Sequence, residues 1–279
     1  MSKLTVRKLT PAIGAVVEGI SLAEPLQDEE IAAISEALLE NQVIFFHNQS
    51  INPVQQHSFA KRFGELHVHP VYPGVSDLPE IMILDTDGDH PPDNDNWHTD
   101  VTFIETPPMG TILSAKQLPP TGGDTLWASC SAAYEALSPP IQTLLLGLKA
   151  EHNFLKSFPS PRQWRDSHDP VARWEEARKN HPPVVHPVVR THPESGRKGL
   201  FVSAGFTTRI LGLHKTESDA LLNFLFAHQT KPEFTLRWTW SVNDLAFWDN
   251  RITQHYAVND YVPHRRVMNR ATVLGDKPF

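Results

Sequence analysis

The sequence predicts a mainly β protein with flanking helices, built on a double-stranded β-helix core of the jelly-roll, cupin-like type. Three observations lead to this prediction. Short runs of β-forming residues alternate with turns after Val71. The chain has 24 prolines, which favour turns and edge strands. No Gly/Ser-rich linker divides the 279 residues, so we expect one domain over residues 1–279.

Composition narrows the function classes. The net charge of −7 argues against nucleic acid as a partner. No stretch approaches the roughly 18 apolar residues that a membrane span needs. The single cysteine, Cys130, excludes an internal disulfide framework and fits a reducing compartment. The first residues lack the apolar core of a secretory signal. We therefore expect a cytoplasmic protein with neither membrane nor nucleic acid as a partner.

The first elements alternate between helix and strand. Residues 28–40 predict a helix with acidic residues in its first turn. The apolar run 42–47 predicts a buried strand. Asn52 and Pro53 are typical of the start of a second helix, which we expect to run to about Phe63 and to end at Gly64.

The rest of the chain is mainly β. Strands are predicted over 81–86, 110–118, 123–129, 186–193, 199–206, 234–240, 243–250 and 265–275. Helices are expected over 132–148, broken near Pro139 and Pro140, and after Thr216. The polar, proline-rich segment 160–183 is interpreted as a loop or lid with one short helix.

The strongest local motif is the only His-x-Asp triplet, His98 and Asp100. In an extended segment these side chains point to one face. They could supply part of a two-histidine, one-carboxylate metal site, with His255 from a distant strand as the third ligand. By itself the triplet is more often a surface loop with a capping aspartate, and His255 alone is more often a turn histidine.

Two arginines favour the metal site over the surface-loop and turn-histidine alternatives. In the predicted strand 265–275, Arg266, Met268 and Arg270 share a face. Two buried guanidinium groups are tolerable if anionic ligands neutralise them. The alternative is an edge strand with both arginines in solvent. The pair His67 and His69 could itself bind a metal, but we prefer an anion-binding role for His69 and a structural one for His67.

At this point the sequence resembles the taurine dioxygenase family within the Fe(II)/2-oxoglutarate oxygenases. The resemblance covers nearly the whole chain. It is carried by the motifs RFGELHVHPVYP (62–73), DNDNWHTDVTF (93–103), GGDTLW (122–127), WDNRITQHYAVNDY (248–261) and RRVMNRATVLGD (265–276).

The resemblance implies a role for each matching position. The iron ligands would be His98, Asp100 and His255. The cosubstrate 2-oxoglutarate would be held by Thr125 and Arg266 at its distal carboxylate, with Arg270 near its chelating end. The sulfonate of the substrate would contact His69, Arg270 and the backbone N–H of Val101. The amine end would face Tyr72, Asn94 and Ser157, with Phe158 and Phe206 as walls.

The implied reaction hydroxylates taurine at the carbon that bears the sulfonate, with Fe(II), 2-oxoglutarate and O2. The products would be succinate, CO2, sulfite and aminoacetaldehyde. The resemblance also implies a homo-oligomer. Three alternatives stay open: a related alkylsulfonate or alkylsulfate dioxygenase, a zinc hydrolase, and a non-catalytic cupin-like binding protein.

Overall fold

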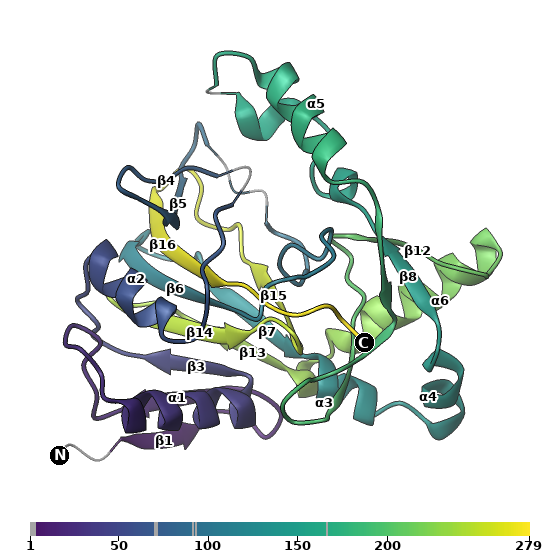
Figure 1. Ribbon diagram of the computed structural model, residues 1–279, viewed down its shortest axis with the longest axis horizontal. Helices are drawn as coiled ribbons and strands as arrows, with labels where there is room; N and C mark the ends of the chain where they lie inside the picture. Colours follow the sequence, from purple (N-terminus) through teal and green to yellow (C-terminus); the bar gives the residue numbers. More distant parts are fainter. Residues whose placement is uncertain (1–3, 70–71, 91, 93, 166) are drawn as a thin grey trace.

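The computed structural model describes residues 4–69, 72–90, 92, 94–165 and 167–279. Its centre is an eight-stranded sheet in the order β1-β2-β3-β14-β6-β16-β5-β4 (Figure 1). The strands are β1 (Thr5–Lys8), β2 (Ala15–Glu18), β3 (Val43–Phe46), β4 (Gly74–Val75), β5 (Leu78–Thr86), β6 (Gly110–Gln117), β14 (Leu245–Asp249) and β16 (Arg266–Val273). All pairs are antiparallel except β2 with β3.

A second, three-stranded sheet has the order β13-β7-β15. Its strands are β13 (Thr235–Trp238), β7 (Thr125–Ser129) and β15 (Thr253–Ala257). One buried cluster joins the two sheets, with Trp127 from the small sheet and Phe45 and Met268 from the large one. Phe45 stacks on Trp238 at a centroid distance of 3.9 Å. Two facing sheets with a shared apolar core form the predicted jelly roll.

The remaining strands form two small sheets, of β12, β8 and β9 and of β10 and β11. Their bounds are β8 (Lys149–His152), β9 (Val184–Pro187), β10 (Val189–Thr191), β11 (Lys198–Leu200) and β12 (Thr207–Ile210). The predicted strand 199–206 was wrong beyond Leu200. There the backbone bonds elsewhere, because Gly205 donates its N–H to Trp97 and Thr207 donates to Ser203. The predicted strand 186–193 is likewise divided between β9 and β10.

Helices flank the sheets. They are α1 (Asp28–Asn41), α2 (Pro53–Lys61), α3 (Cys130–Glu135), α4 (Pro139–Leu145), α5 (Pro170–Asn180) and α6 (Lys215–Gln229), with short 3-10 turns η1 (Phe154–Lys156), η2 (Pro161–Trp164) and η3 (Pro232–Phe234). Helices α1 and α2 pack on the large sheet (Figure 1). The predicted cap is confirmed, since the Asn52 side chain accepts the Gln55 N–H at 2.9 Å. Helix α2 ends at Lys61, two residues earlier than predicted. Among the described residues, no helix is long and apolar enough to cross a bilayer.

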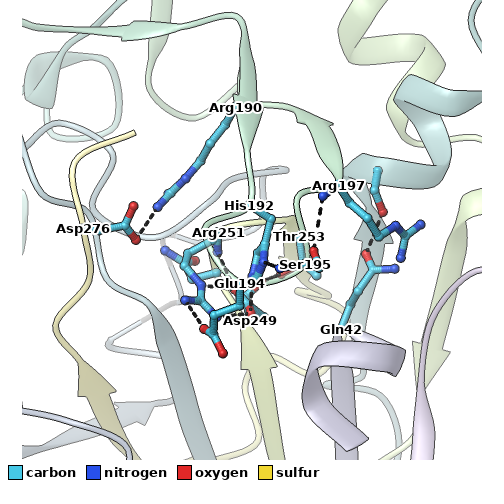
Figure 2. A network of polar contacts seen from close by, with 12 residues as sticks. Gln42, Arg190, His192, Glu194, Ser195, Arg197, Asp249, Arg251, Thr253 and Asp276 are labelled. Atoms are coloured by element: carbon cyan, nitrogen blue, oxygen red, sulfur yellow. Dashed lines mark hydrogen bonds and ion pairs between the residues drawn. The ribbon is translucent and has the colours of Figure 1, made fainter. Parts of the chain in front are cut away.

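A buried network of charges anchors the turn between β14 and β15 (Figure 2). Arg251 holds Asp249 with its Nε at 2.9 Å and its Nη2 at 2.6 Å. His192 Nε2 lies 2.9 Å from Asp249 Oδ2, the oxygen that also accepts from Arg251 Nη2, and Arg251 Nη1 donates to Glu194 at 2.6 Å. Burial opposes the charge on Asp249, but the bonds from Arg251 and His192 hold its pKa below the usual range. The network therefore fixes the segment that leads to His255.

Asp249→Asn should lower the free energy of unfolding by about 3–5 kcal/mol, because Arg251 and His192 would keep their buried donors and lose the carboxylate. Urea denaturation near pH 7 measures the loss. Since the folded-state pKa of Asp249 is lowered, its contribution should be complete above about pH 4 and decline as the pH falls further.

Glu135→Gln is the matched control for this prediction. Glu135 accepts from Arg197 at 3.1 Å on the surface, and exposed pairs contribute less than about 1 kcal/mol. Equal losses in the two variants would show that the buried network adds nothing beyond an ordinary surface ion pair.

Candidate active site

The site begins where two distant segments meet. The His98 N–H donates to the His255 carbonyl at 3.0 Å, and the His255 N–H donates to the His98 carbonyl at 2.8 Å. This antiparallel bridge places the His-x-Asp segment along the edge of β15. The Thr99 hydroxyl adds a bond of 2.8 Å to the Thr253 carbonyl. Two potential ligands thus lie opposite each other at the edge of the small sheet, His255 on β15 and His98 in the bridged segment.

The three predicted metal ligands lie together. His98, Asp100 and His255 are all buried, and one ligand atom from each lies within 4.8 Å of the others. Asp100 Oδ1 is 3.7 Å from His98 Nε2 and 3.6 Å from His255 Nε2. Two atoms bound to one ion at about 2.1 Å can lie up to roughly 4.2 Å apart. The geometry and donor types therefore fit a single divalent ion with open positions.

His98 and His255 are suited to bind a metal as neutral imidazoles. His98 Nδ1 lies 2.8 Å from the Asn96 carbonyl, so Nδ1 carries the proton and Nε2 keeps the lone pair that a metal would bind. Burial lowers the pKa of His255 well below its ordinary value, although the charge of Asp100 opposes this. Among the described residues, no other group of three His, Cys, Asp or Glu side chains is arranged to hold a metal, so His67 is not part of such a group.

The two oxygens of Asp100 have different neighbours. Oδ1 faces the imidazoles, while Oδ2 accepts from Arg270 at 2.7 Å and from the Thr111 hydroxyl at 3.0 Å. Burial would raise the pKa of Asp100, but the positive charge of Arg270 and the nearby His255 outweigh it. Asp100 therefore stays ionised and presents one oxygen to a metal. The ion pair between Arg270 and Asp100 is a contact that the sequence did not predict.

Arg266 lies on the same strand as Arg270, and both are buried, as predicted. Its Nε donates to the Gly123 carbonyl at 3.1 Å. A Cβ at Gly123 would come within 3.1 Å of the Arg266 side chain, so glycine permits this close approach. Burial lowers the pKa of Arg266 from its usual value. The two Nη groups take no part in the Gly123 bond and suit a carboxylate.

Thr125 follows Gly123 at the start of β7. Its side-chain oxygen accepts the indole N–H of Trp240 at 3.0 Å, which leaves the hydroxyl proton for another acceptor. Thr125 does not line either cavity described below. Thr125 is thus buried two residues along the chain from Gly123, whose carbonyl accepts from Arg266.

Two adjoining cavities lie in this region, and the smaller one is lined by the metal ligands His98 and Asp100. The smaller, of about 50 Å³, is lined by His69, Tyr72, Leu84, Asn94, Asn96, His98, Asp100, Val101, Phe103, Ser157, Phe158, Phe206 and Arg270. It gathers every residue predicted to contact the substrate. The larger, of about 600 Å³, shares Tyr72, Leu84 and Asn94 with it and extends past Arg266 toward Arg162 and Arg165.

One end of the small cavity is suited to an anion. His69 Nδ1 accepts the Tyr72 N–H at 3.4 Å, so the ring proton is on Nε2. Burial and the charge of Arg270 lower the pKa of His69 well below its ordinary value, so this donor is neutral. Val101 has a φ of 53°, a strained conformation for a β-branched residue. Such strain often marks a functional backbone group.

Other parts of the lining are aromatic or carry a hydroxyl group. Phe206 approaches His98 edge-on at 6.3 Å and packs with Phe158. A Cβ at Gly205 would lie 2.8 Å from the His98 side chain, so only glycine brings Phe206 this close. The Ser157 hydroxyl donates to the Gly205 carbonyl at 2.7 Å and can accept a bond from a ligand.

Several residues of the site were not predicted. Thr111 and Asn250 bond to Asp100 from positions 11 and 150 residues away. The Tyr261 ring lies 6.0 Å from the Arg266 guanidinium, and its hydroxyl is 2.6 Å from that of Thr86. Asn250 and Tyr261 are within a quoted motif, but nothing in the motif indicates which side chain faces the site.

Comparison with known proteins agrees with this geometry. The family model described as "Taurine catabolism dioxygenase TauD, TfdA family" matches residues 5–272. An α-ketoglutarate-dependent sulfate ester dioxygenase of Pseudomonas putida is 38% identical, over 99% of this chain and 91% of its own length. An alkylsulfatase of Acinetobacter baylyi is 37% identical, over 98% and 86%.

Solved structures are similar as well. A taurine dioxygenase from Burkholderia xenovorans superposes with a TM-score of 0.83 at 36% identity, over 99% of this chain and 92% of that one. The protein AAD-2, crystallised with Mn(II) and N-oxalylglycine, gives a TM-score of 0.82 at 31% identity, over 99% of each chain. The chain therefore belongs to the TauD, TfdA family of α-ketoglutarate-dependent dioxygenases, which use Fe(II), 2-oxoglutarate and O2.

Proposed function

We propose that this enzyme hydroxylates taurine at the carbon that bears the sulfonate. The products would be sulfite and aminoacetaldehyde, with succinate and CO2 from 2-oxoglutarate. The observation that carries the proposal is the small cavity beside the metal ligands. Its lining combines anion donors, from His69 and Arg270, with the polar, uncharged side chains of Tyr72, Asn94 and Ser157.

His98, Asp100 and His255 would hold Fe(II) through two Nε2 atoms and one carboxylate oxygen. Three positions of the ion would stay open for the cosubstrate and O2. When bound, Fe(II) and 2-oxoglutarate activate O2 and so supply the oxidising power to hydroxylate a C–H bond. Arg270 and Thr111 bind the second oxygen of Asp100, so Asp100 would offer its other oxygen to the ion.

Arg266 would bind the distal carboxylate of 2-oxoglutarate, with Thr125 as a second donor. Two observations support this proposal. Arg266 is buried, and a buried charge is costly unless an anion neutralises it. Its two Nη groups are not used in the bond to Gly123, so they can donate to a carboxylate. Arg270 would neutralise charge near the chelating end, since its Nη2 already lies 2.7 Å from Asp100. The two arginines thus match a cosubstrate with two carboxylates.

The protein's own part in the reaction is to orient the substrate and exclude water. His69, Arg270 and the Val101 N–H would bind the sulfonate, which fixes the adjacent carbon near the ion. Tyr72, Asn94 and Ser157 would face the amine. The walls of Phe158 and Phe206 would keep water from the reacting carbon.

A sulfate ester is the second candidate substrate. The relatives of 37% and 38% identity are named for sulfate esters, and the adjoining cavity of about 600 Å³ offers room for a longer chain. The polar groups at the amine end support taurine instead. Membership of a dioxygenase family leaves the zinc hydrolase and the non-catalytic binding protein without support.

We also propose that residues 160–183 act as a lid on the domain formed by residues 1–279. Arg162, Gln163 and Arg165 line the larger cavity. Helix α5 stands away from the sheets in Figure 1, and the Trp174 indole N–H donates to the Phe158 carbonyl at 2.9 Å.

Cys130, buried and free, supports a reducing location such as the cytoplasm.

Arg266→Lys should weaken 2-oxoglutarate binding at least about tenfold, because an ammonium group cannot hold a carboxylate at two points. Titration of 2-oxoglutarate into the anaerobic Fe(II) enzyme, followed by absorbance, measures the affinity. Arg265→Lys is the control, because Arg265 is adjacent to Arg266 in the sequence but is paired with Asp85 at the surface. An unchanged affinity in Arg266→Lys would remove Arg266 from the cosubstrate site.

His69→Ala should raise the KM for taurine roughly tenfold or more, with little change in 2-oxoglutarate affinity. A hydrogen bond to a charged group contributes about 1.5–3 kcal/mol. Initial rates at varied taurine give the KM. His67→Ala is the control, because His67 does not line the small cavity. If both variants behave like the unmodified enzyme, the sulfonate lies elsewhere.

Substrate choice is tested by kcat/KM for taurine, pentanesulfonate and hexyl sulfate. Taurine should have the highest value, because the two competitors lack the amine that Tyr72, Asn94 and Ser157 would contact. The discrimination should be modest, since all three groups are uncharged. A higher value for hexyl sulfate would replace the taurine proposal with the sulfate ester reading.

A further inference from the structure

We infer that Asn250 is a positioning residue that fixes the backbone of Asp100 and both ends of loop 101–107. It would thereby hold a metal ligand and the substrate-facing amide of Val101 in one arrangement. The inference deepens the proposed function and rests on the assignment of the metal centre to His98, Asp100 and His255.

Asn250 is fully buried in the turn between β14 and β15, and its side chain makes three bonds to backbone. Its Oδ1 accepts the Asp100 N–H at 2.9 Å, and its Nδ2 donates to the Asp100 carbonyl at 3.1 Å. The same Nδ2 donates to the Pro108 carbonyl at 3.2 Å. The amide therefore takes the place of a neighbouring strand for Asp100, since it pairs with both of that residue's backbone groups.

Asp100 needs such a partner more than the histidines do. His98 and His255 fix one another by two backbone bonds. Asp100 lies beyond the end of that bridge, in a turn, and no β-strand pairs with it. An aspartate side chain is short, so the position of its carboxylate depends closely on that of its backbone. Asn250 supplies the restraint that the sheet does not.

The adjacent residue adds a second requirement. Val101 has a φ of 53°, which costs energy and persists only where the surroundings impose it. Its amide is the predicted sulfonate donor, and Phe103 in the same loop lines the small cavity. By bonding Asp100 before the loop and Pro108 after it, Asn250 holds both ends. Loss of the Asn250 side chain would therefore disturb both the Asp100 carboxylate and the loop that carries Val101 and Phe103.

The test uses the full-length protein and Fe(II) alone, titrated anaerobically by calorimetry. Asn250→Ala should weaken Fe(II) binding roughly ten- to a hundredfold, the range typical of residues that orient metal ligands. Asn250→Asp keeps the size and the acceptor but lacks the two N–H donors, and it should also bind Fe(II) more weakly than the unmodified protein. Both titrations are made at a temperature where circular dichroism shows the variant to be folded.

Gln49→Ala is the matched control. Gln49 is buried too, and its side chain makes the same set of bonds: it accepts the Leu22 N–H at 2.8 Å and donates to the Ile20 and His47 carbonyls at 3.3 and 2.9 Å. Gln49 does not line either of the two cavities beside the metal ligands. Gln49→Ala should lower the unfolding temperature about as much as Asn250→Ala and leave Fe(II) affinity within twofold of the unmodified value.

The outcomes separate the inference from the proposal on which it rests. Fe(II) affinity in Asn250→Ala equal to that in Gln49→Ala would overturn the positioning role. If His255→Ala binds Fe(II) as tightly as the unmodified protein, the metal centre itself is wrong. Hydrogen exchange on the unmodified, metal-free protein is independent of any variant. The Asp100 amide should exchange slowly, and exchange as fast as in an exposed loop would also overturn the inference.

Discussion

The site depends on the pair of backbone hydrogen bonds between His98 and His255. These bonds, of 3.0 and 2.8 Å, join segments 157 residues apart and extend the small sheet by one short bridge. Because side chains opposite each other in such a bridge lie close together, the two imidazoles meet at a centroid distance of 4.2 Å. Asp100 completes the set from the turn that follows, where Asn250 bonds its backbone N–H and carbonyl.

Charge is distributed so that each buried ion has a partner or a proposed ligand. Asp100 is held by Arg270, and Asp249 by Arg251 and His192. Within the described part of the chain, the Gly123 carbonyl is the one hydrogen-bond acceptor of the Arg266 side chain, so Arg266 is the cation best placed to receive an external carboxylate. The charged network around Asp249 also anchors the turn that precedes β15, and it thereby helps to place His255.

The sequence predicted the parts of the site that depend on local spacing. The two-residue separation of His98 and Asp100 indicated a common face, and the period of two in the strand that became β16 indicated that Arg266 and Arg270 share a face; the structure adds that both are buried. The strand β15 was not predicted as such, because TQHYA carries polar residues and lacks a clear alternation. The contacts of Asn250 could not be predicted either. They join positions 150 and 142 residues apart, and only the folded topology brings them together.

The central claim is that a two-histidine, one-carboxylate centre couples 2-oxoglutarate decarboxylation to cleavage of a C–S bond. The most direct measurement is the release of succinate and sulfite from taurine, with Fe(II), 2-oxoglutarate and O2 each omitted in turn. We expect equal amounts of the two products in the complete mixture and neither sulfite nor coupled succinate when any component is missing. Sulfite formed without 2-oxoglutarate or O2, or succinate formed with no sulfite, would contradict it.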